Sequence, residues 1–259
     1  MKKTKISPNL SDFPKDYHSL LKEGPIFDSS CSPEARVFYI PKGEGLYLKQ
    51  GKRGALKREA TLTEWFHQKG LAAKVLDYKS EEYDWLLTEA VAGEDCTHYC
   101  HEPARLAATL AKILRELHER PFADCPMQDR LASYFKTAGE NYQKGQFDLS
   151  YGWPSAPLES AEQAWRLIEE QRHLLKNEAL IHGDYCLPNI LLKDWQFSGF
   201  IDLGAAGVAD RHIDLYWAIW TLQFNLHTDA YAETFKEAYG KHLIEEEKLR
   251  LISAFEIFG

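Results

Sequence analysis

Residues 182–204, HGDYCLPNILLKDWQFSGFIDLG, place polar residues at the ends of two short apolar runs. The runs are Ile190–Leu192 and Phe200–Ile201, and short apolar runs bounded by turn residues are typical of buried strands. An Asp and an Asn precede the first run, and Asp-Leu-Gly follows the second. Because Asp, Asn and Gly are poor strand formers, the stretch predicts two strands whose ends carry the polar groups of a site.

The spacing of these polar residues matches what phosphoryl transfer requires. His182-Gly183-Asp184 is followed after four residues by Asn189, and Asp202-Leu203-Gly204 closes the next apolar run. Protein kinases carry the same spacing as H-R-D-x-x-x-x-N followed by D-F-G. We therefore expect Asp184 to accept or orient the substrate hydroxyl, and Asn189 and Asp202 to hold the metal ion that bridges the nucleotide phosphates. We expect His182 to brace the loop by hydrogen bonds rather than to titrate.

Each half of this pattern taken alone is an ordinary turn signal, because Asp before Gly is more often a turn than a ligand. The two halves in order, with the four-residue gap and the flanking strands, favour the catalytic interpretation.

Composition bounds the fold and the partners. The chain has 259 residues, 44% of them hydrophobic, which suffices for one large core or two modest ones. Its net charge of −8 disfavours a nucleic acid as partner and suits a cationic small ligand. No run approaches the roughly 18 apolar residues of a membrane span, and no apolar segment follows the basic start MKKTKISPNL. We expect no membrane association and a cytoplasmic protein.

The five cysteines are odd in number and scattered, which indicates reduced thiols rather than a disulfide framework. The segment CTHYCH offers Cys96, His98, Cys100 and His101 as soft metal ligands. It lacks the C-x2-C spacing of structural zinc sites, so a loop leading into a helix is the favoured interpretation.

The hydrophobic period changes along the chain. Residues 36–49 read as two strands joined by turn residues, 54–69 as a helix ending before Gly70, and 75–87 as a second strand pair. From residue 103 onward the pattern is mainly helical, beginning with an amphipathic helix over PARLAATLAKILRELHER. Further helices are predicted at 160–176, 214–224, 231–240 and 245–258. The fold class is α+β.

The chain resembles the aminoglycoside phosphotransferases, and most closely their 3'-phosphotransferase branch. The resemblance is carried by HGDYCLPNILL, by FSGFIDLGAAGVADRHIDL and by the ISP near the start. It implies a protein-kinase-like two-lobed fold, with a small N-terminal β-rich lobe and a larger, mainly helical C-terminal lobe. The implied boundaries are a nucleotide-binding lobe at 1–87, a hinge at 88–93, and a catalytic and substrate-binding lobe at 94–259.

The same resemblance implies an activity connected with antibiotic resistance. The γ-phosphoryl group of ATP or GTP would be transferred, with Mg²⁺, to a hydroxyl of a small molecule, namely the 3'-hydroxyl of a cationic aminoglycoside. Kinases of other small hydroxylated metabolites or antibiotics, and an inactive kinase-like binding module, stay open as alternatives. A protein kinase is disfavoured because no A-P-E segment follows Asp202.

The nucleotide-binding residues follow from this resemblance. Lys49 ends the strand LYLK, as the family's phosphate-binding lysine does, and Glu59 in the following helix is its expected ion-pair partner, with Glu64 as the alternative. Ser32 lies where the family's phosphate loop falls. The backbone of Thr88 and Ala90 would meet the purine edge.

Substrate binding is expected at the C-terminal tail, through Glu256, Phe258 and the Gly259 carboxylate. The family tends to be acidic at three positions that are neutral here, namely Gln223, Asn225 and Phe255. This departure predicts a narrower or weaker aminoglycoside profile.

Asp210 and Asp214 also match family positions, and they are expected to stabilise the large lobe as buried carboxylates or caps. Trp217 and Trp220 are expected to belong to the core rather than to stack on a ligand.

Overall fold

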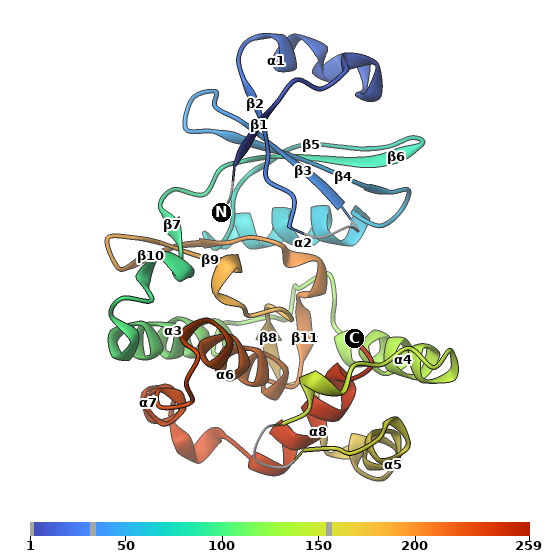
Figure 1. The fold of residues 1–259 in the computed structure, drawn as a ribbon, viewed down its shortest axis with the longest axis vertical. Coiled ribbons are helices and arrows are strands. Elements are labelled where there is room, and N and C mark those ends of the chain that lie inside the picture. Colours follow the sequence, from blue (N-terminus) through green and yellow to red (C-terminus); the bar gives the residue numbers. More distant parts are fainter. Residues whose placement is uncertain (1–2, 32–34, 154–156) are drawn as a thin grey trace. The chain divides into compact units, whose positions relative to one another are not determined.

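The computed structural model describes residues 3–31, 35–153 and 157–259 (Figure 1). The chain divides into two compact units. The first unit comprises Met1–Cys96 and Pro188–Gly204, and the second comprises Thr97–Leu187 and Ala205–Gly259. The functional boundaries expected at residues 87 and 93 stay predictions.

A six-stranded antiparallel sheet forms the body of the first unit, in the order β1-β2-β3-β4-β6-β5. Its strands are β1 (Thr4–Ile6), β2 (Ile26–Asp28), β3 (Ala35–Ile40), β4 (Leu46–Lys52), β5 (Val75–Ser80) and β6 (Tyr83–Glu89). The predicted hairpin at 36–49 is confirmed as β3 and β4. Gly43 and Gly45 in its turn have φ of 61° and 108°, which glycine adopts without steric cost.

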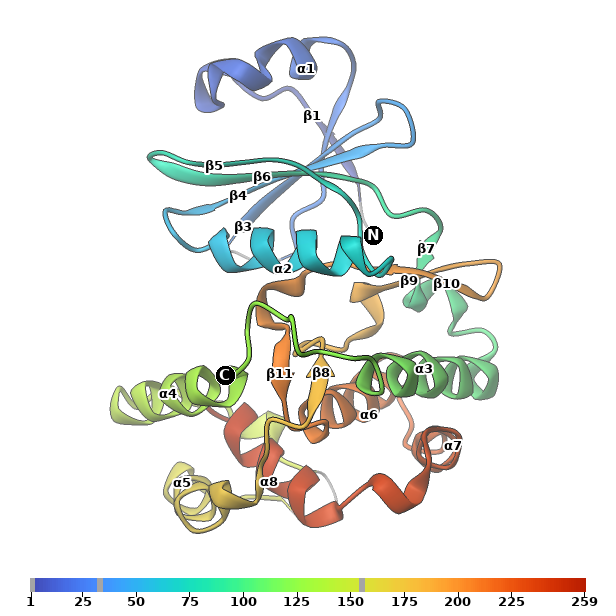
Figure 2. The same ribbon diagram turned by 180° about the vertical axis from the view of Figure 1, so that it is seen from behind.

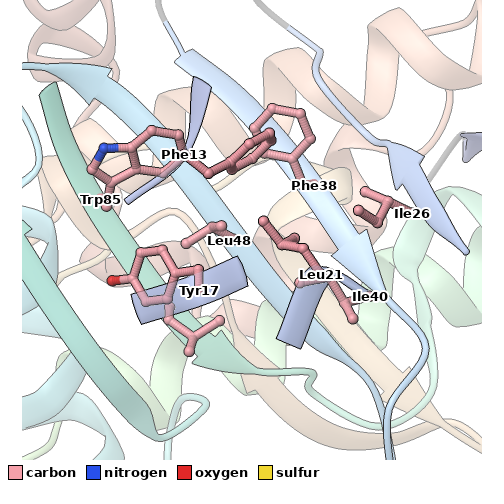
Figure 3. Packing of buried hydrophobic residues seen from close by; sticks show 9 residues of the cluster. Phe13, Tyr17, Leu21, Ile26, Phe38, Ile40, Leu48 and Trp85 are labelled. Carbon is pink, nitrogen blue, oxygen red and sulfur yellow. The ribbon is translucent and has the colours of Figure 1, made fainter. Parts of the chain in front are cut away.

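Each face of this sheet is covered by a different part of the chain (Figure 2). Helix α2 (Lys57–Gln68) covers one face, and the N-terminal segment with α1 (His18–Lys22) covers the other. Since side chains alternate along a strand, Leu86 of β6 packs with Leu56 and Ala60 at α2. Trp85 points the opposite way, into the cluster around Phe13, Tyr17, Leu21, Ile26, Phe38, Ile40 and Leu48 (Figure 3).

The hairpin predicted from the opening stretch is confirmed as β9 (Ile190–Lys193) and β10 (Gln196–Phe200). With β7 (Glu94–Asp95) it forms a three-stranded sheet in the order β10-β9-β7. Phe200 bridges to Ala72, so the hairpin packs with the first unit although it is far along the chain.

The second unit is mainly helical. Its helices are α3 (Pro103–His118), α4 (Arg130–Gln143), α5 (Ala161–Gln171), α6 (His212–Leu226), α7 (Ala232–Tyr239) and α8 (Glu246–Glu256). The apolar face predicted for α3 is confirmed, because Leu106, Leu110, Leu114 and Leu117 are all buried. Helix α4 carried no prediction; it begins where the Asp129 carboxylate accepts a hydrogen bond from the Ala132 amide.

Two short antiparallel strands, β8 (Ala179–Ile181) and β11 (Gly207–Ala209), run through the middle of the second unit. All six of their residues are buried, and the segment that carries Asp184 begins directly after β8. The core strand therefore fixes the start of this loop.

None of the helices within the described ranges combines the length and the apolar character that crossing a membrane requires.

Candidate active site

Lys49, Glu59 and Asp202 form a charged cluster in the first unit, which we call the Lys49 cluster. The Lys49 ammonium donates to Glu59 Oε1 and Oε2 at 2.9 and 2.8 Å and to Asp202 Oδ1 at 2.6 Å. Strand alternation aims Lys49 at α2, since its neighbour Leu48 points into the core on the other face. Burial opposes the charge on Lys49, but the two carboxylates outweigh it and raise the pKa of the ammonium above its ordinary value.

The ion pair predicted between Lys49 and Glu59 is thus present, and the alternative partner is not used. Glu64 instead accepts a hydrogen bond from Gln68 at 3.2 Å on the exposed side of α2. Glu59 is only 8% exposed, which makes Lys49 its necessary counter-charge.

The ends of the β9–β10 hairpin bring Asn189 and Asp202 to one place. Asn189 directly precedes β9, and the Ile201 amide after β10 donates to the Asn189 carbonyl at 3.0 Å. Asp202 follows with φ of 61°, a left-handed conformation that is uncommon for residues other than glycine. Its side chain is 51% exposed, so part of it is accessible to an incoming ligand.

The structure says less about the remaining nucleotide positions. Ser32 lies outside the described residues. Thr88 pairs with Tyr47 on one side and Val75 on the other within the sheet. The Ala90 amide donates to the Gly45 carbonyl at 2.9 Å, so a purine edge there would compete with this bond.

Asp184 lies in a tightly held loop of the second unit, which we call the Asp184 loop. The Asp214 carboxylate from α6 accepts hydrogen bonds from the amides of His182 and Gly183, both at 2.7 Å. Gly183 has φ of 84°, and a Cβ there would lie 2.1 Å from the Ala205 carbonyl oxygen. No residue but glycine fits, which explains the Gly of the H-G-D motif.

His182 braces this loop, as predicted. It is fully buried, and its Nδ1 accepts a hydrogen bond from the Asp184 amide at 3.3 Å. The Asp184 carbonyl accepts from the Cys186 amide at 2.8 Å, which closes the turn after the motif. The backbone on both sides of Asp184 is therefore fixed.

His118 of α3 extends this support and was missed in the sequence. It is buried, and its Nε2 lies 3.3 Å from Asp214 Oδ2 while its Nδ1 lies 2.8 Å from the Tyr239 hydroxyl. Burial lowers the pKa of His118, so the ring is neutral near pH 7. Because a carboxylate only accepts, Nε2 carries the proton and Nδ1 accepts from Tyr239. The available signal was a histidine on the apolar face of an otherwise regular amphipathic helix.

Asp210 and Asp214 are both fully buried, as expected for stabilising residues. Asp210 accepts from the His212 amide at 3.0 Å and pairs with the His212 ring at 2.6 Å, at the start of α6. Burial acts to raise its pKa, but these hydrogen bonds and the nearby Lys248 lower it overall. Asp210 thus holds the N-terminus of the helix that carries Asp214.

Glu256 from the C-terminal tail is buried in the second unit. Its Oε1 accepts from the Tyr134 hydroxyl at 2.8 Å and from the Trp217 indole at 3.1 Å. Burial raises the pKa of Glu256 to about 7, with the charge of Asp184 adding to the effect and the two hydrogen bonds acting against it. Sequence reasoning missed Tyr134, whose helix α4 was not predicted.

The other tail positions differ in exposure. The Phe258 ring is 2% exposed and packs edge-on against Tyr142 and Trp165, whereas Gly259 is exposed. Phe255, which stands where the family tends to be acidic, is buried and stacks on Phe135 with centroids 5.1 Å apart. An aspartate in this aromatic setting would be desolvated, so the neutral residue fits the core around it.

Within the part of the chain that the structure describes, no three His, Cys, Asp or Glu side chains lie close enough together to hold a metal ion. In the CTHYCH segment, Cys96 is buried while His98 and His101 are exposed. A bound ion near Asp202 would therefore take some of its ligands from elsewhere.

Phosphotransferases with a protein-kinase-like fold have a buried lysine–glutamate pair beside a β-sheet. They also carry an aspartate on a loop that a helical unit holds. Comparison with known proteins agrees. Residues 34–252 match the Phosphotransferase enzyme family. The chain is 43% identical to the "Probable aminoglycoside 3'-phosphotransferase" of Lactococcus lactis subsp. lactis (strain IL1403), over 97% of each protein.

Solved structures give the same answer. An aminoglycoside 3'-phosphotransferase of type VIII is 27% identical with a TM-score of 0.71, over 89% of this chain and 92% of that one. An aminoglycoside phosphotransferase from Streptomyces rimosus, solved with ADP and streptomycin, is 25% identical with a TM-score of 0.72, over 86% and 90% of the two chains. The chain belongs to the aminoglycoside phosphotransferase family, which confirms the predicted kinase-like α+β fold and the phosphotransferase activity.

Proposed function

We propose that this phosphotransferase transfers the γ-phosphoryl group of ATP or GTP to the 3'-hydroxyl of an aminoglycoside. The observation that carries the proposal is the 43% identity to an aminoglycoside 3'-phosphotransferase over 97% of both chains. The relative from Streptomyces rimosus, which was solved with ADP and streptomycin, supports a nucleotide cosubstrate and a cationic acceptor. Such an activity would act on the antibiotic in the cytoplasm and contribute to resistance.

The Lys49 cluster is the proposed holder of the triphosphate. The ammonium already lies 2.6 Å from Asp202 and 2.8 Å from Glu59, so it is fixed in place before any nucleotide binds. Its raised pKa keeps it charged at neutral pH, as phosphate binding requires. Ser32 and the backbone of Thr88 and Ala90 are the further proposed nucleotide contacts.

The donors near the hairpin end fit magnesium. Asn189 and Asp202 offer hard oxygen atoms, and Mg²⁺ in phosphotransfer sites takes one or two such protein ligands besides phosphates and water. The Asp202 carboxylate already accepts a hydrogen bond from a cation, the Lys49 ammonium, at 2.6 Å, which supports a role in holding positive charge. When bound, Mg²⁺ would neutralise charge on the phosphate oxygens. Asn189 and Asp202 would be its protein ligands.

Asp184 is the proposed group that meets the acceptor. Its carboxylate would orient the attacking hydroxyl and accept its proton as the new O–P bond forms, while the bond from the γ-phosphorus to the β–γ bridging oxygen breaks and the nucleoside diphosphate leaves. Positioning depends on the loop: His182 Nδ1 holds the Asp184 amide, and Asp214 holds the two residues before it. A loop fixed in this way costs little reorganisation when the acceptor arrives.

Glu256 is the proposed carboxylate for an ammonium group of the acceptor, with Phe258 and the Gly259 terminus completing the tail. With a pKa of about 7, Glu256 is only partly charged at neutral pH. An arriving ammonium would favour its charged form. Binding of a cationic acceptor should therefore strengthen as pH rises through 7.

The test compares two aminoglycosides that differ in one group. The enzyme is incubated with Mg-ATP and either a kanamycin-type acceptor or its 3'-deoxy analogue. The molecular masses of the products are then measured by mass spectrometry. We expect one phosphoryl group on the first compound and none on the second. Equal phosphorylation of both would contradict 3'-transfer. Turnover of uncharged sugars with none on any aminoglycoside would overturn the proposed acceptor class, as would loss of all turnover.

A further inference from the structure

Four aromatic side chains form a continuous row on the surface of the second unit, which we call the aromatic row. Trp220 stacks on Phe224 with centroids 4.8 Å apart and planes 10° apart, and it stacks on Tyr151 at 5.7 Å and 29°. Trp217 meets both Trp220 and Tyr151 edge-on, at 5.4 and 5.9 Å. The positions 217, 220 and 224 are three and four residues apart, so they share one stripe of α6.

This row is partly open to solvent, and Trp217 and Trp220 are only partly buried, whereas they were expected to belong to the core. Phe224 is 61% exposed, and Trp217, Trp220 and Tyr151 are partly exposed. Water contact with this much aromatic surface is unfavourable, and exposed aromatic patches commonly mark binding sites.

The row is continuous with the proposed acceptor residues inside the second unit. The Trp217 indole donates to Glu256 Oε1 at 3.1 Å, and among the described residues both hydrogen bonds to Glu256 end on that oxygen. One turn along α6, Thr221 Oγ1 accepts from the Leu187 amide at 3.2 Å, three residues after Asp184. A molecule that reaches Asp184 and Glu256 therefore lies next to the row.

The chemistry of the row favours a ring face over a multiply charged group. Gln223 and Asn225, which neighbour Phe224 in the sequence, are neutral. The Asn225 side-chain amide donates hydrogen bonds to the Thr221 carbonyl oxygen at 2.8 Å and to Thr221 Oγ1 at 3.1 Å. A flat aromatic surface binds the apolar C–H face of a sugar ring and leaves the hydroxyls free for polar partners. It offers an ammonium group only cation–π attraction, not a full counter-charge.

We propose that the aromatic row binds a sugar ring of the acceptor, one other than the ring that is phosphorylated, through its non-polar face. The inference rests on the proposed function, because it takes the acceptor to be a glycoside. The enzyme would then prefer acceptors that have at least two rings and few ammonium groups. Fully charged, many-amine aminoglycosides would bind less well.

The experiment removes rings from the row in the intact enzyme. Phe224→Ala and Trp220→Ala should each raise the KM for the acceptor by roughly three- to tenfold. The acceptor used is a two- or three-ring aminoglycoside that the wild-type enzyme phosphorylates. The KM for the nucleotide and the kcat should stay unchanged. Tyr83→Ala is the matched control, because Tyr83 is an exposed aromatic residue of the first unit, 43% accessible. An unchanged acceptor KM in both row variants would overturn the proposal.

Two further measurements distinguish sugar binding by the aromatic row from a dimer interface and from failure of the proposed function. Light scattering measures the molecular mass of wild type and of Phe224→Ala. A wild-type dimer that dissociates in the variant would assign the row to contact with a second copy of the chain and would overturn the proposal. If no aminoglycoside is phosphorylated, the proposed function fails, and the row is tested by tryptophan emission on titration with maltose. A saturable change that is lost in Trp220→Ala supports sugar binding, whereas no change in wild type overturns it.

Discussion

The Lys49 cluster and the Asp184 loop use the same side chain, aspartate, in different ways. Asp202 in the first unit is 51% exposed and pairs with an ammonium at 2.6 Å. Asp214 in the second unit is fully buried and accepts two backbone amides at 2.7 Å and the His118 ring at 3.3 Å. The first carboxylate is partly exposed and can be reached by a ligand, and the second is occupied by hydrogen bonds to the scaffold.

The two aspartates of the motif region thus have different roles, one in ligand binding and one in supporting the loop. A partly exposed carboxylate that pairs with an ammonium can also accept a metal ion as its partner. A carboxylate that accepts backbone amides cannot be replaced without leaving those amides unpaired. Variants at the two kinds of position should therefore change different measurements.

The largest effect on folding is expected from Asp214→Ala. It leaves the His182 and Gly183 amides and the His118 ring without their acceptor in a buried place, so the free energy of unfolding should fall by roughly 3–5 kcal/mol. Urea unfolding measures this, with Asp202→Ala as control and an expected change within about 1 kcal/mol. Equal stability of the two variants would remove the distinction between scaffold and ligand carboxylates.

Glu256 should make stability depend on pH. Its carboxyl has a folded-state pKa of about 7, above the ordinary 4.5, so the folded state keeps the proton more tightly than the unfolded chain. Its stabilising contribution is full below pH 4.5 and is lost as pH rises to about 7. Relative to Glu256→Gln, wild type should lose roughly 2–3 kcal/mol of unfolding free energy between pH 4.5 and pH 8. Parallel pH profiles of the two proteins would show that Glu256 is ionised as readily folded as unfolded.

A smaller effect is expected within the Lys49 cluster. Lys49→Ala should raise the nucleotide KM about tenfold or more, and Glu59→Ala should raise it less, since Glu59 acts by orienting Lys49. Lys52→Ala, an exposed lysine at the end of the same strand, is the control and should leave KM unchanged. A double-mutant cycle should show coupling of about 1 kcal/mol; additive changes would mean that the observed pair does not serve nucleotide binding.

Most helices and strands could be predicted from local sequence patterns. The β3–β4 hairpin, α2 with its stop before Gly70, and α3 follow from hydrophobic period and turn residues, which act over a few positions. Helix α4 was missed because its sequence, RLASYFKTAGENYQ, has one leucine, no isoleucine, valine or methionine, and a glycine in its interior. That the β9–β10 hairpin packs with the first unit depends on long-range contacts such as Ala72 with Phe200, which no local pattern reports.

The site divides in the same way. Spacing alone singled out Asp184, Asn189 and Asp202, and the family resemblance singled out Lys49. The expectation that Lys49 ends its strand was wrong, because β4 continues to Lys52. The support beneath them was invisible, because His118 reaches Asp214 from 96 residues away. The exposure of Trp220 was also misjudged, since tryptophan in an apolar helix is usually buried and only the packing of α6 decides which stripe faces water.

The most direct test of the account measures phosphoryl transfer and nucleotide affinity together in two variants. Asp184→Asn and Asp202→Asn are each loaded with Mg-ATP, the dissociation constant is measured, and a single turnover on a kanamycin-type acceptor is followed. Asp184→Asn should bind nucleotide as wild type does but transfer at least about 10²-fold more slowly. Asp202→Asn should lose Mg-ATP affinity. Wild-type transfer by Asp184→Asn, or unchanged Mg-ATP affinity in Asp202→Asn, would contradict it.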